Sequence, residues 1–225
     1  MVEDGLLELE HMIKITYLGQ SSFKIKSTNA ALITDPFDSK ATGLPWRKQE
    51  ADIVTISHEH SDHNCLDKID GNPFVIREPG EYEIKGVHII GESSSHGQTD
   101  GKDLGENTFF TFRWDDFVIV HLGDLGKPLA SAQLEELGQV DVLMVPVGGK
   151  WTIGAEAASE LIAQIEPCFV VPMHYRLVEE QKDLQPVKEF LDQMGAENIT
   201  SQSSLDLKSK NALPDQTQVV LLDYK

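Results

Sequence analysis

A segment with the sequence HEHSDH starts at His58, directly after the apolar run 52–57, and places three imidazoles and a carboxylate close together. Side chains alternate in direction along an extended segment, so His58 and His60 point the same way and can bind one ion. Asp62 and His63 are adjacent, so a turn would let them diverge toward a second ion. A solvated loop with incidental histidines would account for a lone His-x-His, but the longer pattern favours a metal site at the end of a strand.

Three further residues of the same chemical types lie far apart in the rest of the chain: His96, Asp124 and His174. Asp124 ends the sequence HLGD, and His174 ends the apolar segment VVPMH. Imidazole nitrogens and carboxylate oxygens are ligands that suit zinc, and also iron, manganese or nickel. The ordered set is much more specific than any one of its members, and it makes metal chemistry the leading hypothesis.

The chain of 225 residues has the size of one domain with a substantial core. No apolar run approaches the roughly 20 residues needed to cross a bilayer, and no signal-peptide pattern opens the chain. We therefore expect a cytoplasmic protein without membrane association. Two cysteines do not suggest a disulfide framework. Cys65 lies two positions past His63, so a ligand role is open, but a small buried thiol is the favoured interpretation.

The formal net charge of -18 constrains the partners. A polyanion would be repelled at long range, and no basic run offsets this charge. We therefore expect a small-molecule substrate and no nucleic-acid partner, although a local metal pair would still admit a small phosphate ester. The sequence leaves the oligomeric state open, and a homo-oligomer is compatible with it.

The first eleven residues are acidic and lack the strand alternation that begins abruptly at Met12. We interpret residues 1–11 as a tag or a disordered extension, and we exclude His11 from the site. Residues 12–225 are expected to form a single metallo-hydrolase domain.

The pattern of elements changes near residue 130. Before it, short segments of period two predict strands, and after it helices and strands alternate. Predicted strands cover 13–18, 22–25, 31–34, 52–57, 74–77, 81–85, 87–91, 107–114, 117–122, 141–147, 169–172 and 218–223. Predicted helices cover 131–137, 154–165 and 186–194. This order suggests sheets covered by helices on their outer faces, with ligands gathered in loops at the sheet edges.

From Met12 onward, these motifs resemble those of the metallo-β-lactamase superfamily. Within it the chain is most similar to the small, stand-alone metal-dependent hydrolases that include ascorbate-6-phosphate lactonase, through the segments TDPF (34–37), LGDLG (122–126) and PMHY (172–175). The resemblance implies an α/β fold, a four-layer α/β-β/α sandwich of two mixed sheets flanked by helices. Two branches are set aside: the diiron branch has glutamate where this chain has His60, and the antibiotic-cleaving enzymes typically carry cysteine near the place of Asp124.

The resemblance also implies a role for each candidate ligand. One divalent ion would be bound by His58, His60 and His96. The second would be bound by Asp62, His63 and His174, with Asp124 bridging the two. The ions would be Zn²⁺, with Mn²⁺, Fe²⁺ or Ni²⁺ as alternatives, and would share a hydroxide that attacks a small-molecule lactone, ester or phosphodiester. Asp62 would be catalytic, because it could both ligate a metal and orient the nucleophile.

Two alternatives to this hydrolase stay open. One is a nuclease or nucleotide phosphodiesterase of the same superfamily, and the other is a metal-stabilised binding protein without turnover. Some individual roles are also open. His121 could hydrogen-bond a ligand or be a satisfied core histidine. Tyr175 and Arg176 directly follow a candidate ligand and could reach the pocket, whereas Lys102 is more simply a solvated side chain on the substrate rim.

Overall fold

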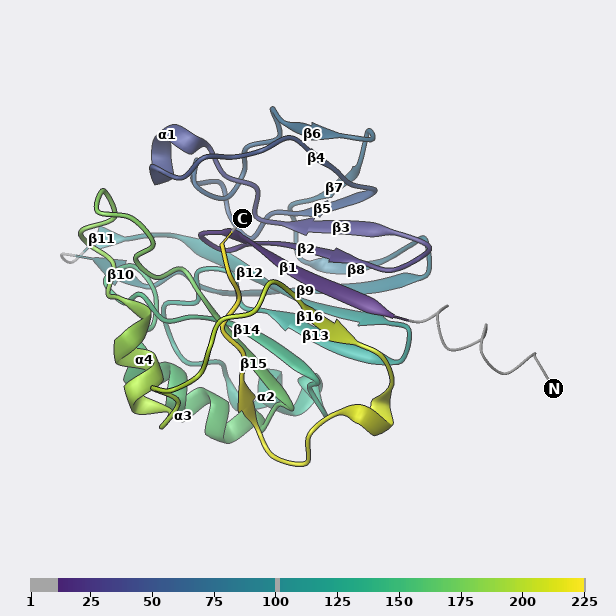
Figure 1. Ribbon diagram of the computed structural model, residues 1–225. Helices are drawn as coiled ribbons and strands as arrows, with labels where there is room; N and C mark the ends of the chain where they lie inside the picture. The colour runs from purple at the N-terminus through teal and green to yellow at the C-terminus, as the bar shows by residue number, and fades with distance from the viewer. Residues whose placement is uncertain (1–11, 100–101, 225) are drawn as a thin grey trace.

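Two mixed β-sheets face each other in the computed structural model (Figure 1). The structure describes residues 12–99 and 102–224, so the expected extension 1–11 lies outside the described part. The predicted sandwich of two mixed sheets is confirmed. None of the helices in these two ranges is long and apolar enough to cross a membrane.

The first sheet is built mainly from the N-terminal third of the chain, in the order β16-β1-β2-β3-β5-β7. The strands from β16 to β3 pair antiparallel, and β3, β5 and β7 run parallel. Its strands are β1 (Ile13–Gly19), β2 (Ser22–Lys26), β3 (Ala31–Thr34), β5 (Ile53–Thr55), β7 (Phe74–Ile76) and β16 (Leu205–Leu207).

The second sheet has the order β17-β15-β14-β13-β12-β9-β8. Strands β13, β14, β15 and β17 are parallel, and the remaining neighbours pair antiparallel. Its strands are β8 (Gly80–Ile84), β9 (Val87–Ser95), β12 (Glu106–Trp114), β13 (Phe117–His121), β14 (Val142–Pro146), β15 (Phe169–Met173) and β17 (Gln218–Val219).

The outer layers of the sandwich differ. Helices α2 (Ser131–Leu137), α3 (Ala155–Ile165) and α4 (Val187–Gln193) lie against the second sheet, on its side away from the first (Figure 1). The outer face of the first sheet is covered by one short helix, α1 (Ser39–Thr42), and by the pair β4 (Gln49–Glu50) and β6 (Ile69–Asp70). There Phe37 packs edge-on against Trp46, with ring centroids 4.7 Å apart. The remaining short elements are β10 (Gln98–Thr99), β11 (Lys102–Asp103) and the 3₁₀ helix η2 (Lys210–Ala212).

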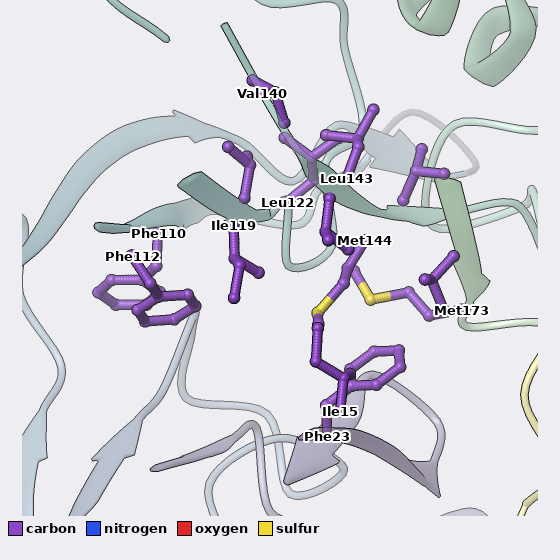
Figure 2. Close-up of a cluster of buried hydrophobic side chains, with 14 of the residues drawn as sticks. Ile15, Phe23, Phe110, Phe112, Ile119, Leu122, Val140, Leu143, Met144 and Met173 are labelled. Atoms are coloured by element: carbon purple, nitrogen blue, oxygen red, sulfur yellow. The ribbon is translucent and has the colours of Figure 1, made fainter. Parts of the chain in front are cut away.

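The main core lies between the two sheets. Ile15 and Phe23 of the first sheet point toward Met144 and Met173 of the second (Figure 2), and all four side chains are fully buried. Burying a large apolar side chain contributes about 1.5–3 kcal/mol, so this layer holds the strand ends in fixed positions. The period-two alternation of β1 follows directly, because Ile13, Ile15 and Tyr17 are buried.

One predicted strand is largely wrong. The sequence suggested a strand over 218–223, but β17 ends at Val219. The Val220 amide still donates to Val170 of β15, but the next residues bond to Gln202 instead: the Gln202 amide donates to the Leu221 carbonyl, and the Asp223 amide donates to the Gln202 carbonyl. The apolar run 219–222 is therefore a partly buried segment, of which Leu222 alone is fully buried, rather than a continuous strand.

Candidate metal centre

Strand ends of both sheets meet at one end of the sandwich and carry the candidate ligands. His96 directly follows β9, His174 directly follows β15, and Asp124 lies three residues after β13. Strands β9, β13 and β15 run in the same direction, so their carboxyl ends share an edge of the second sheet. The loop 58–63 follows β5 of the first sheet. The fold thereby brings together side chains that are more than a hundred residues apart in sequence.

One carboxylate oxygen is the centre of the cluster. Oδ2 of Asp124 lies 3.1 Å from Nε2 of His174, 3.3 Å from Nε2 of His63, 3.7 Å from Nε2 of His96 and 4.0 Å from Nε2 of His58. Oδ2 of Asp62 lies 3.4 Å from Nε2 of His63. Four imidazoles therefore direct the same nitrogen at one buried aspartate.

The donor atoms form overlapping groups small enough to hold an ion. In each group the ligand atoms lie within 4.8 Å of one another. The groups are His58, His60 and His96; His58, His63 and Asp124; and Asp62, His63 and His174. The first and third match the two sets implied by the family resemblance, and Asp124 lies between them. The structure thus brings all seven predicted residues together, while their roles as ligands stay a prediction.

Asp35 fixes the hydrogen-bonding state of two of the histidines. Its Oδ2 lies 3.0 Å from Nδ1 of His63 and accepts a hydrogen bond of 2.7 Å from the Ser57 hydroxyl. Because that hydroxyl donates to Asp35, its oxygen must accept from Nδ1 of His58, 3.0 Å away. Both rings therefore donate a proton from Nδ1 and direct Nε2 at the cluster.

His96 is held in the same orientation by the backbone. Its Nδ1 donates to the Trp151 carbonyl at 3.1 Å, so Nε2 again faces the cluster as a free acceptor. The Nε2 atoms of His58 and His63 are buried and have no hydrogen-bond partner among the described residues. Buried polar nitrogens are normally paired, and metal ligands typically donate their other ring nitrogen in this way. The donor set therefore fits divalent metal ions.

The electrostatics of the cluster differ between its donor atoms. Burial and the neighbouring His63 together lower the pKa of His58 to about 3. Burial would also lower the pKa of His63, but Asp124 and Asp62 hold it well above its ordinary value. Burial alone would raise the pKa of Asp124, but His174 and His63 hold it well below its ordinary value. A neutral imidazole and an ionised carboxylate are the forms that bind metal, so His58 and Asp124 are already in the binding form at neutral pH, whereas His63 would release a proton when an ion binds.

An open cavity of about 720 Å³ is bordered by five of the candidate ligands: His60, Asp62, His96, Asp124 and His174. One wall is formed by α1 with Gly43, and another by the loop 180–184; Leu104 and Trp151 contribute apolar surface. Lys40 and Lys182 line the same cavity. Neither Tyr175 nor Arg176 is among its lining residues: Tyr175 is buried near Tyr17, with ring centroids 6.1 Å apart, and Arg176 is exposed.

Several residues that shape the site had no assigned role from the sequence. Asp35 lies in the TDPF segment but was not singled out as a site residue. Asn107 accepts a hydrogen bond from the Asp124 amide and donates to the Leu122 carbonyl, which fixes the Asp124 loop. His121 is a satisfied core histidine in the structure, because Nε2 donates to the Ser21 carbonyl and Nδ1 accepts from the Gly123 amide. Its nearest link to the cluster is indirect, through the Ser21 hydroxyl bonded to Asp124.

A buried His/Asp cluster at the end of a two-sheet sandwich indicates a metal-dependent enzyme. Residues 14–174 match the family model described as a beta-lactamase superfamily domain, so the chain belongs to this superfamily. A UPF0173 metal-dependent hydrolase of Pyrococcus horikoshii is 30% identical over 192 residues, covering 73% of this chain and 85% of the relative. A relative of the same description from Thermococcus onnurineus is 30% identical over 193 residues, with the same coverage.

A solved structure agrees with these relatives. It belongs to a Thermotoga maritima protein assigned to the Zn-dependent hydrolases of the metallo-beta-lactamase superfamily. That protein is 36% identical, with a TM-score of 0.75, covering 96% of this chain and all of the other. The predicted family, fold class and enzyme class are thereby confirmed.

Proposed function

We propose that the chain is a cytoplasmic, dinuclear zinc hydrolase that acts on a small anionic ester, with a lactone or phosphodiester group as the cleaved bond. One ion is held by the group formed by His58, His60 and His96. The other is held by Asp62, His63 and His174, and Asp124 lies between the two groups. When bound, such a pair of ions polarises the cleaved ester and lowers the pKa of water to about 7, so that water can react at neutral pH.

The observation that carries this proposal is the shared orientation of three histidine rings, each with Nε2 directed at the cluster. His58, His63 and His96 each commit Nδ1 to a neighbour, through Ser57, Asp35 and the Trp151 carbonyl respectively. The buried Nε2 atoms of His58 and His63 have no hydrogen-bond partner among the described residues, which a purely structural cluster would not favour. Metal ions supply the missing partner for these nitrogens.

Asp62 is the residue best placed to handle the proton of the attacking water. Its Oδ2 accepts from the Gln20 amide at 3.0 Å and lies beside His63. Its Oδ1 has no hydrogen-bond donor among the described residues, and Asp62 lines the cavity. Oδ1 is therefore the oxygen free to orient a water molecule and accept its proton.

Two lysines favour a negatively charged substrate. Lys40 and Lys182 line the cavity together with Glu180, and neither lysine forms an ion pair within 12–99 or 102–224. The nearby Asp183 is neutralised by Lys150, 2.5 Å away. An anionic group on the substrate would complete the pairing of these lysines even though the whole chain is acidic, because charges beyond about 8 Å are screened at physiological salt.

The test combines metal analysis with a substrate panel. Purified protein loaded with zinc should contain two ions and should hydrolyse a phosphate-bearing lactone or bis-p-nitrophenyl phosphate faster than neutral p-nitrophenyl acetate. Asp62→Ala and His63→Ala should each reduce the metal content toward one ion and abolish turnover while the protein stays folded. Loss of turnover with both ions retained would remove these residues from the ligand set.

The other candidates give different results in the same panel. A fully metal-loaded protein that hydrolyses no ester, lactone or phosphodiester would support a binding protein without turnover. Cleavage of RNA at physiological salt would support the nuclease alternative. It would contradict the small-molecule assignment, which rests in part on the acidity of the chain, since an acidic protein repels a polyanion.

A further inference from the structure

A directional chain of hydrogen bonds connects the cavity wall to Asp62. The backbone amide of Leu177 donates to Oε1 of Gln181 at 2.8 Å. Nε2 of Gln181 then donates to Oε1 of Gln20 at 3.0 Å, and Nε2 of Gln20 donates to Oδ2 of Asp62 at 3.0 Å. A backbone N–H can only donate and an ionised carboxylate can only accept, so the two ends fix the orientation of both amide groups.

Gln20 is held firmly at the centre of this series of hydrogen bonds. It is 3% exposed, and its backbone lies in the left-handed region with φ of 55°. Its carbonyl accepts from the His174 amide and from the Tyr17 hydroxyl, both at 2.8 Å. Gln20 therefore contacts two candidate ligands of the same ion, Asp62 through its side chain and His174 through its backbone. A non-glycine residue in this conformation is uncommon, and such residues cluster at functional sites.

The other end of this series of hydrogen bonds lies at the cavity wall. Gln181 lines the cavity beside Lys182 and Leu184. This wall is anchored where the Gln185 amide donates to the Gly148 carbonyl and where Asp183 pairs with Lys150. The wall that would contact the substrate is thus linked by two side chains to a metal-ligand candidate in the opposite wall.

We propose that Gln20 and Gln181 are positioning residues that orient the Asp62 carboxylate from the segment 177–184, of which residues 180–184 line the cavity. The proposal rests on the proposed function in one respect, namely that Asp62 binds the second ion. Gln20 holds one carboxylate oxygen so that the other is presented to water, and Gln181 acts only through Gln20. Neither residue touches the substrate bond that is broken.

The test is a double-mutant cycle with Gln20→Met and Gln181→Met, which keep the side-chain length and remove the hydrogen bonds. Binding of the second zinc ion is measured by competition with a chromophoric chelator, independently of turnover. Removing a residue that orients a ligand typically costs 10–100-fold in metal affinity. We expect Gln20→Met to lower the affinity for the second zinc ion about tenfold and Gln181→Met to lower it about threefold. The double variant should bind this ion no more weakly than Gln20→Met alone.

Two controls separate the possible failures. Gln164→Met removes a comparable amide from the exposed face of α3 and should leave both ions unaffected. Asp62→Ala should lose the second ion; if it does not, the proposed ligand set fails. If Asp62→Ala loses that ion while Gln20→Met binds it normally, or if the effects of the two glutamine variants simply add, the positioning proposal is overturned and the metal site stands.

Discussion

Nδ1 of His63 lies 3.0 Å from Oδ2 of Asp35, and both side chains are completely buried. Burial would raise the pKa of Asp35, but the hydrogen bond and charge of His63 hold it below its ordinary value. Asp35 also accepts from the amide and the hydroxyl of Ser57, at 2.7 Å each. One aspartate behind the cluster therefore orients a candidate ligand directly and a second one, His58, through Ser57.

Replacing Asp35 tests this arrangement. Asp35→Asn keeps the shape but removes the charge, and it leaves too few acceptors for Ser57 and His63. We expect zinc affinity to fall about 10–100-fold, because ligand-orienting carboxylates typically contribute that much. Metal competition titration measures the change. Asp206→Asn, which alters an exposed aspartate 3.8 Å from Lys14, serves as the control and should bind zinc normally. Equal affinities for the two variants would contradict the role of Asp35.

The candidate ligands could be found from the sequence because their chemistry is visible in single residues. Histidine and aspartate residues grouped at the end of a strand indicate a metal site, whatever their neighbours in the fold are. The role of Asp35 was not visible in this way. It depends on Thr34 pairing beside Thr55 in parallel strands, which places Asp35 against Ser57 and His63. Local patterns predict that a strand exists but not which strand lies next to it.

The same limit explains the fold elements that were missed. Strand β16 has only three residues, and it pairs with β1 from almost the other end of the chain. Its sequence, LDL, is too short to show a period. The longer strands and all three long helices were predicted near their observed bounds, because repeated apolar positions there record a buried face. Gln20 was missed for a third reason, since an isolated glutamine gains its role only from partners 42 and 161 residues away.

The unpaired lysines of the cavity predict a charge preference. Lys40→Met and Lys182→Met should each raise KM for bis-p-nitrophenyl phosphate by about three- to tenfold, since an exposed charge pair contributes roughly 0.2–1 kcal/mol and a desolvated one somewhat more. The value of kcat should change little, because the lysines do not contact the cleaved bond. Steady-state kinetics at low and high salt measure both quantities. Lys208→Met is a matched surface control. A rise in KM for neutral p-nitrophenyl acetate of the same size would contradict an electrostatic role.

Asp52 predicts a specific pH dependence of stability. The Lys85 ammonium, 2.5 Å from Oδ1, holds the pKa of Asp52 below its ordinary value, and the Ala31 amide adds to this. A lowered folded pKa stabilises the protein above the unfolded value of about 3.9, and the contribution is lost as pH falls through the folded pKa.

Metal-free Asp52→Asn should therefore be less stable than the unmodified chain at pH 7, by up to about 1 kcal/mol after solvent screening. The difference should close as the pH is lowered from 4 to 2. Urea unfolding of both proteins across this range provides the measurement. A difference that stays constant down to pH 2 would show that the ionised form of Asp52 contributes nothing to stability.

Gly126 predicts the cost of disturbing the backbone beneath His96. A Cβ atom at this position would overlap the His96 carbonyl and the Gly97 amide, and both are backbone groups that cannot move aside as a flexible side chain would. Gly126→Ala should destabilise the fold by about 1–3 kcal/mol, the usual cost of overpacking, and should weaken zinc binding because His96 is displaced. Gly154→Ala is the matched control, since its φ of -95° suits alanine and the nearest atom to a Cβ lies 3.8 Å away. Thermal unfolding and zinc titration of the two variants test this expectation; an unchanged zinc affinity for Gly126→Ala would mean that the cluster tolerates movement of His96.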